Sequence, residues 1–274
     1  MQDHPQGRSV YFLVQSFHEF TKLVRQAAEK SDVDFSTKEF LGLKPQIREV
    51  IFLDTADFRL YNNAFILRRR ITYEDGFLVG DPEIVFKFRH PDLQKAAEMD
   101  VRPHISGDYR IKFKAEALPL KNEVGGFRLL FSHNVEFPLS AVHEGNRSSM
   151  ATLTHVFPPL QILKSTESDS VELVNATAVE EVLLDIGMLD FGKGIEAKAN
   201  TAVWRTRGDQ KQLVGEFAFQ CKFQRRDDIH DKVRNRVEQF FCSLQHIAQD
   251  WLALGVTKTG AVYRLKGNPP NAHE

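Results

Sequence analysis

The chain has 274 residues, of which 42% are hydrophobic and 27% charged, and its formal net charge at pH 7 is -1. This near balance argues against a protein that binds nucleic acid over its whole surface, because such proteins carry a clear basic excess. No apolar run approaches the ~18 residues that a membrane-spanning helix needs. Only two cysteines are present, Cys221 and Cys242. We therefore expect a cytoplasmic protein with no disulfide framework, no membrane association and no nucleic-acid partner.

The first half of the chain predicts mostly strands. Residues 9–15 are interpreted as a first strand, and the capping-box spacing of Ser16 and Glu19 predicts a helix from there to about Lys30. Apolar and alternating runs then predict four strands, and the turn residues before the third of them favour a hairpin. These four strands are expected at 48–55, 64–73, 83–89 and 109–117.

The second half begins with a stretch rich in Ser, His and Pro, residues 138–170, which predicts an irregular excursion with a short strand at 160–164. Apolar residues at alternating spacings of four and three predict a long helix from Asp228 to about Leu254. The basic tail at 257–267 is expected to add an edge strand. Together these elements indicate an α+β fold in a single domain covering 1–274. Three further strands are expected at 180–192, 195–207 and 215–224.

Basic residues alternate with apolar ones along several of the expected strands. Successive side chains of a strand point to opposite faces, so Arg68 and Arg70 share one face while Arg69 lies on the other. Such faces are ordinarily the solvated side of a sheet. A nearly closed sheet would instead turn them inward around a cavity suited to phosphate or polycarboxylate. The basic residues on these faces are Arg68, Arg70, Lys87, Arg89, Lys112, Lys114 and Lys222.

Three segments resemble the CYTH-domain proteins, also called triphosphate tunnel metalloenzymes. Residues 52–70, FLDTADFRLYNNAFILRRR, are similar to the family's second and third strands with their Arg-x-Arg motif. Residues 180–192 resemble a later strand that ends in Asp and Gly, and residues 214–223 resemble a Glu-rich strand that ends in Lys. The order and rough spacing agree over about residues 9–265.

This resemblance implies an antiparallel eight-stranded β-barrel-like tunnel with flanking helices, among them a long C-terminal one. In the family, basic residues inside the tunnel hold a triphosphate, and carboxylates hold Mg²⁺ or Mn²⁺ for phosphoryl transfer. Arg68, Arg70, Lys87 and Lys222 match the family's phosphate-binding positions. Glu181 and Asp185 lie near its acidic positions, and Glu216 lies in its Glu-rich strand.

The acidic motifs depart from the family pattern. The expected first strand has no carboxylate, and the late Glu-x-Glu-x-Glu motif reads Glu216, Ala218 and Gln220. Hard divalent cations need oxygen ligands, preferably anionic, so a complete two-metal site is not expected. Asp100 could help to rebuild one metal site, or it could be an ordinary exposed charge.

Three functions remain open from the sequence. The first is a metal-dependent hydrolase of a triphosphate compound, acting on an acid anhydride. The second is a module that binds a phosphate-rich small molecule or polyphosphate, such as a triphosphate or a nucleotide, in a basic tunnel without catalysis. The third is a protein-interaction module whose tunnel is closed by internal ion pairs.

Overall fold

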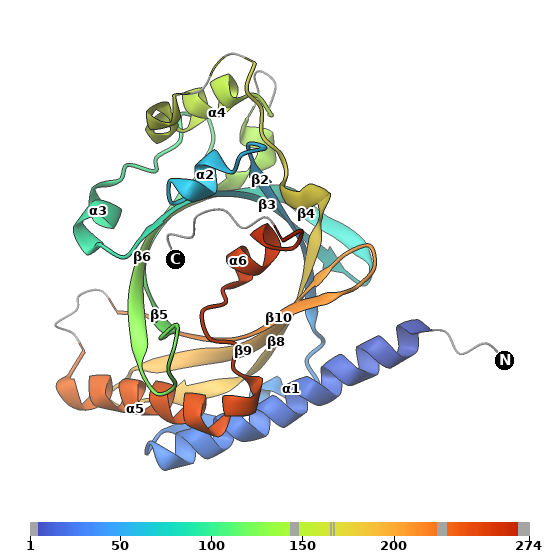
Figure 1. Ribbon diagram of the computed structural model, residues 1–274. Helices are drawn as coiled ribbons and strands as arrows, with labels where there is room; N and C mark the ends of the chain where they lie inside the picture. Colours follow the sequence, from blue (N-terminus) through green and yellow to red (C-terminus); the bar gives the residue numbers. More distant parts are fainter. Residues whose placement is uncertain (1–4, 143–147, 165, 167, 224–228, 268–274) are drawn as a thin grey trace.

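The computed structural model describes residues 5–142, 148–164, 166, 168–223 and 229–267. Its centre is an antiparallel sheet of 10 strands that curves into a barrel (Figure 1). Eight strands follow one another in the order β10-β9-β8-β2-β3-β4-β6-β5, while β1 pairs with β8 and β7 with β2. No described pair joins β5 to β10, so the barrel is not closed by backbone pairing. The strands are β1 (Asp34–Ser36), β2 (Gln46–Asp54), β3 (Phe65–Glu74), β4 (Phe77–His90), β5 (Arg110–Pro119), β6 (Phe127–Pro138), β7 (Glu172–Leu173), β8 (Val179–Asp190), β9 (Glu196–Thr206) and β10 (Gln212–Cys221).

Two long helices, α1 (Pro5–Lys30) and α5 (Asp231–Ile247), lie side by side outside the barrel (Figure 1). They cover the outer face of β8, β9 and β10. On α5 the buried residues Val233, Phe240 and Leu244 recur at helical spacing. They pack against Phe191, which follows β8, and against Ala199 of β9. None of the helices in the described part of the chain is both long enough and apolar enough to cross a membrane.

A second cover lies over β3, β4 and β6. It consists of α4 (Met150–Val156) and a 3-10 helix η3 (Pro158–Leu163), with α2 (Arg59–Asn62) beside them (Figure 1). The ring of Phe157 stacks on that of Phe86 in β4, with centroids 4.2 Å apart. The outward apolar residues of these strands are therefore buried, which leaves the other face of each strand to line the inside of the barrel. The remaining short helices are α3 (Leu93–Glu98), η1 (Lys38–Phe40), η2 (Leu139–Ala141), η4 (Val174–Ala176) and η6 (Gln249–Trp251).

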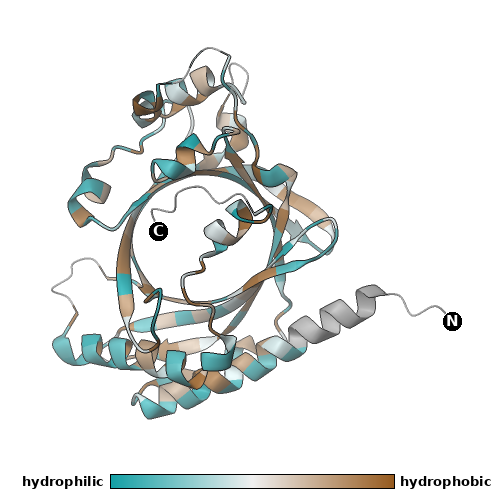
Figure 2. Ribbon diagram, in the orientation of Figure 1, coloured by the Kyte–Doolittle hydropathy of each residue, from teal (hydrophilic) through white to brown (hydrophobic). Residues whose placement is uncertain are grey.

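Besides the two apolar layers under the outer helices, a third apolar cluster lies inside the barrel around α6 (Lys258–Tyr263). Figure 1 shows α6 within the ring of strands. Val262 and Tyr263 of α6 are fully buried against Phe52, Tyr61 and Trp204. Figure 2 shows hydrophilic and hydrophobic residues mixed along the barrel strands, as expected where the two faces of a strand meet different surroundings. One part of the barrel interior is thus an apolar core.

The structure confirms the α+β class, the eight-stranded tunnel and the long C-terminal helix, and it corrects three local predictions. The strand at 9–15 is wrong, because these residues belong to α1; no Gly or Pro separates them from the helix that follows. The strand at 160–164 is wrong, because two prolines at its start lead into η3. The edge strand at 257–267 is wrong, because the Thr257 hydroxyl caps α6 by accepting a hydrogen bond from Gly260 N at 3.0 Å.

Candidate anion site inside the barrel

The interior face of β3, β4, β5 and β6, called here the basic wall, gathers most of the predicted phosphate-binding residues. In the strand register Arg68 lies opposite Val85, while Lys87 and Lys112 both lie opposite Asn134. Side chains in register share a face of a sheet. The opposite face of β3, β4 and β6 is covered by α4 and η3, and β5 continues the sheet beside β6, so these side chains point into the lumen. Brought together in this way are Arg68, Arg70, Lys87, Arg89, Lys112 and Lys114.

Two further basic residues belong to this wall and were not among the predicted site residues. Arg110 precedes Lys112 by two positions on β5 and faces Glu136 in register. Arg128 lies on β6, a strand that the sequence analysis did not identify. Residues 127–138 do alternate between apolar and polar side chains, so a signal for this strand was present.

Glu116 is the first carboxylate of the basic wall. It lies 2.5 Å from Lys87 Nζ and 3.5 Å from an Arg89 guanidinium nitrogen, and it accepts a hydrogen bond from Ser132 Oγ at 2.8 Å. Burial would raise the pKa of Glu116, but Lys87 and Arg89 beside it hold that pKa well below its usual range.

Glu83 and Glu136 are the other two carboxylates of this wall. Glu136 pairs with Lys112 at 2.5 Å and with both Arg70 and Arg110 at 3.4 Å. Glu83 pairs with Arg70 and, at 3.1 Å, with Arg110. Each carboxylate is therefore shared by at least two basic groups, and the wall carries a surplus of positive charge.

The surplus is concentrated on Arg68, Lys114 and Arg128, none of which makes an ion pair or hydrogen bond within the described ranges. The Nε atoms of Arg68 and Arg128 are buried and have no hydrogen-bond partner there. Burial, followed by repulsion from Arg70, lowers the pKa of Arg68 to about 10. Burial and Lys112 lower the pKa of Lys114. Buried donors without partners cost free energy. An anion bound to these groups would reduce that cost.

The pKa of Lys87 is also affected by the neighbouring positive charges. Burial lowers its pKa to about 7, and Arg89 and Arg68 act in the same direction while Glu116 opposes them. An anion bound between these side chains would favour their charged forms.

The opposite interior face, formed by β2, β8, β9 and β10 with α6, is called here the paired wall. Its ion pairs are one to one. Arg48 lies 3.4 Å from Glu181, and Lys198 lies 3.0 Å from Asp185. Lys258 of α6 lies 2.8 Å from Glu216, which also accepts a hydrogen bond from Trp204 Nε1 at 3.0 Å.

The residues expected to hold Mg²⁺ or Mn²⁺ do not fit that role in this arrangement. Glu181, Asp185 and Glu216 each face a basic side chain, and a cation at any of them would have to displace it. Asp100 lies outside the lumen, where it pairs with Arg102 in the segment between α3 and β5. Over the part of the chain that the structure describes, three or more His, Cys, Asp or Glu side chains nowhere form a group suited to a metal ion.

Lys222, the remaining predicted phosphate ligand, lies just beyond the end of β10 and is exposed. In the alternation of side chains along β10, Lys222 falls on the inward-facing side. It is not enclosed, however, as the side chains of the basic wall are. The structure therefore assembles six of the seven predicted basic residues at one place.

Contacts at both ends of the helix α6 hold it inside the barrel. At its start Lys258 pairs with Glu216. At its end the Asn175 amide donates to Val262 O at 2.8 Å and to Tyr263 O at 3.0 Å. The Tyr263 hydroxyl donates to Asp54 Oδ2 at 3.0 Å. Sequence reasoning missed these contacts because they join residues that lie far apart along the chain.

Asp54 also organises the segment that precedes β3. It accepts backbone hydrogen bonds from Thr55 at 2.8 Å and from both Leu60 and Tyr61 at 2.9 Å. Burial raises the pKa of Asp54 to about 6, and these hydrogen bonds oppose the shift. The Asp-Thr sequence at the start of the family-like segment thus has a structural role, joining β2, α2 and α6.

Comparison with solved structures finds proteins of similar architecture. A protein from Hippeastrum, described as an adenylyl cyclase with a dominant triphosphatase activity, is 12% identical over 92% of each chain, with a TM-score of 0.41. A protein from Bacillus halodurans described as an adenylate cyclase is 11% identical, covering 82% of this chain and 90% of that one, with a TM-score of 0.34. A protein from Pyrococcus horikoshii is 13% identical, covering 88% and 86%, with a TM-score of 0.31.

The described strands form a barrel-like antiparallel sheet with helices outside it, which is the architecture that the sequence resemblance implies. No protein-family model matches the sequence. A search of curated proteins finds no match either. Likeness at these identities and TM-scores does not indicate what this chain does, so the function of the barrel has to be argued from its own residues.

Proposed function

We propose that the protein binds a phosphate-rich anion, a triphosphate or a polyphosphate, on the basic wall of its tunnel. The observation that supports this proposal is the charge surplus, eight basic side chains beside only three carboxylates. A single phosphate would be neutralised by two of these side chains. A chain of phosphates matches the spread of the surplus over four strands.

Arg68 and Lys114 are the groups that contact the anion first in this proposal. Guanidinium groups bind phosphate oxygens through parallel hydrogen bonds, and Lys adds a point charge. Both side chains are partly buried in the lumen, where attraction between charges is screened less than at the surface. Both also lack a competing carboxylate partner among the described residues, so binding does not require an existing ion pair to break.

Titration calorimetry with tripolyphosphate tests the proposal. Arg68→Met and Lys114→Met should each weaken binding by about 10-fold or more, the value of one or two charge-assisted hydrogen bonds. Lys198→Met is the matched control, because it removes one lumen-facing charge from the paired wall and should change affinity less than about threefold. Binding should also weaken as ionic strength rises. Equal affinity in all four proteins would refute the proposal.

Hydrolysis through a bound metal is not included in the proposal, because the carboxylates that would hold the metal are ion-paired. The same titration repeated with Mn²⁺, together with an assay of released phosphate, separates the two functions. Metal-independent binding without release supports a binding module. Release of phosphate that requires Mn²⁺ and is lost in Arg68→Met would instead establish a hydrolase.

A further inference from the structure

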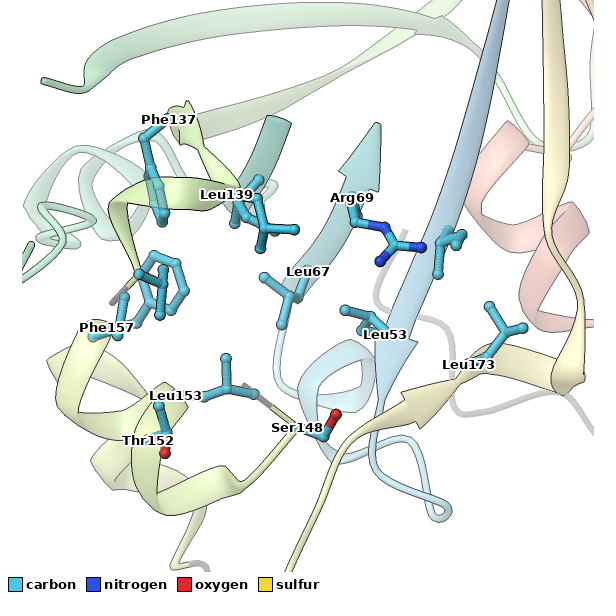
Figure 3. Close-up of a pocket in the computed structure, with 14 residues that line it drawn as sticks. Leu53, Leu67, Arg69, Phe137, Leu139, Ser148, Thr152, Leu153, Phe157 and Leu173 are labelled. Carbon is cyan, nitrogen blue, oxygen red and sulfur yellow. The ribbon is translucent and has the colours of Figure 1, made fainter. Parts of the chain in front are cut away.

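A second cavity lies on the other side of the same sheet, outside the barrel. Its volume is about 380 Å³, and it is partly open, with the outer face of β2, β3, β4 and β6 on one side and α4 with the residues that flank it on the other. Apolar side chains form most of its wall, including Leu53, Leu67, Phe137, Leu153 and Phe157 (Figure 3). Protein interiors seldom leave voids larger than a water molecule, whereas this volume lies in the range of small-molecule sites.

Of the described residues that line the cavity, Arg69 is the one that carries a charge, and its side chain lies beside Leu67 and Leu53 in Figure 3. The Nε atom of Arg69 is buried and has no hydrogen-bond partner among the described residues. Its neighbours in register are Ile51 on β2 and Ile84 on β4, so the adjacent strands offer it no carboxylate. The two other polar residues of the wall, Ser148 and Thr152, carry no charge.

A charged guanidinium in apolar surroundings without a partner is costly, and native proteins seldom keep one without a reason. An apolar cavity with a single charged group at its edge is complementary to a molecule with an aliphatic tail and one anionic head. The planar guanidinium matches a carboxylate through two parallel hydrogen bonds.

We propose that this cavity binds an aliphatic monocarboxylate, with the carboxylate on Arg69 and the tail among the apolar residues beneath α4. The site is separate from the tunnel, since Arg68 and Arg69 point to opposite faces of β3. The two adjacent arginines therefore serve two different ligands, a polyphosphate inside the barrel and a carboxylate outside it.

The position of Arg68 and Arg69 on one strand provides a matched pair of variants. Calorimetry would measure decanoate and tripolyphosphate binding to the full chain, to Arg69→Met and to Arg68→Met. Arg69→Met should weaken decanoate binding by about 10-fold or more and leave tripolyphosphate binding unchanged. Arg68→Met should leave decanoate binding unchanged. Decanoate binding that is equal in the wild type and Arg69→Met overturns the proposal, whatever the result with tripolyphosphate.

A second test varies the length and charge of the ligand and fills the cavity with a larger side chain. Affinity should rise about threefold for each added methylene from hexanoate to decanoate, because each one leaves water for the cavity. Decanol, which lacks the charge, should bind about 10-fold more weakly than decanoate. Leu139→Trp places a large side chain at the partly exposed side of the cavity and should abolish decanoate binding. Decanoate binding by Leu139→Trp with wild-type affinity, or affinity independent of tail length, would contradict a ligand seated in the cavity.

Discussion

The two interior walls of the tunnel use the same kinds of side chain in different proportions. On the paired wall Glu181, Asp185 and Glu216 each have one basic partner in the described structure. On the basic wall three carboxylates are shared among five of the eight basic groups, and the other three, Arg68 among them, have no ion pair in the described structure. One-to-one pairing compensates the charges within the fold, whereas the surplus on the basic wall is not compensated by any described residue. In the proposed function the basic wall meets the ligand, and the paired wall contributes ion pairs within the barrel.

The helix α6 adds to the difference between the paired wall and the basic wall. It packs Val262 and Tyr263 against Phe52 and Trp204, and it supplies Lys258 to neutralise Glu216. The paired wall is therefore completed by the C-terminal part of the chain. The basic wall has no equivalent cover inside the lumen among the described elements, so its charges remain available.

The largest expected effect comes from removing the carboxylate that holds Lys87 and Arg89. Glu116→Gln removes a carboxylate that Lys87 and Arg89 share and should lower the free energy of unfolding by about 3 kcal/mol, as for other broken buried ion pairs. Tripolyphosphate should restore part of this loss because it replaces the missing negative charge. Urea unfolding with and without tripolyphosphate measures both effects.

Asp185→Asn is the matched change on the paired wall. Its partner Lys198 is 55% exposed, so the loss should stay below about 1 kcal/mol. Tripolyphosphate should give this variant no added stabilisation beyond that of the wild type. Similar losses for Glu116→Gln and Asp185→Asn would remove the distinction between the two walls.

Lys258→Met is expected to destabilise the protein less than Glu116→Gln does. Without Lys258, the Glu216 carboxylate keeps the Trp204 N–H as its hydrogen-bond donor among the described residues, which should cost about 2 kcal/mol of stability. The double variant Lys258→Met with Glu216→Leu should recover most of the loss, because an apolar pair needs no charge compensation. Thermal unfolding of the single and double variants tests this. A double variant less stable than Lys258→Met would show that the carboxylate has another essential partner.

The smallest effect is a proton uptake on ligand binding. Lys87 has a pKa lowered to about 7, and a bound anion raises it because negative charge favours the protonated amine. Tripolyphosphate should therefore bind more weakly as the pH rises from about 7 to about 9, with uptake of about half a proton near neutrality. Calorimetry in buffers of different ionisation enthalpy measures this number.

Lys87→Arg is the control for this measurement, because an arginine stays charged over the whole range. It should show only the proton uptake that belongs to tripolyphosphate itself. An uptake equal in the wild type and in Lys87→Arg would show that Lys87 does not titrate on binding.

Much of the fold follows from local patterns. The alternation in residues 64–73 and 109–117 identifies β3 and β5. The stripe that predicts a helix from Asp228 to about Leu254 identifies α5, which runs from Asp231 to Ile247. Local patterns failed where tertiary packing overrides preference. Residues 9–15 have aromatic and β-branched side chains but continue a helix, and residues 258–263 of the predicted edge strand form a helix within the barrel.

The sequence by itself determined which side chains share a face, because the period of a strand is a property of its own backbone. That is why the separation of Arg68 and Arg70 from Arg69 could be predicted. Only the tertiary structure decided which charges meet. The pairing of Lys87 with Glu116 and of Lys258 with Glu216, and the cover of α4 over Arg69, depend on the register and closure of elements distant in the chain. Charge pairing requires contact at a few ångströms, and no local pattern specifies contacts at that range between distant segments.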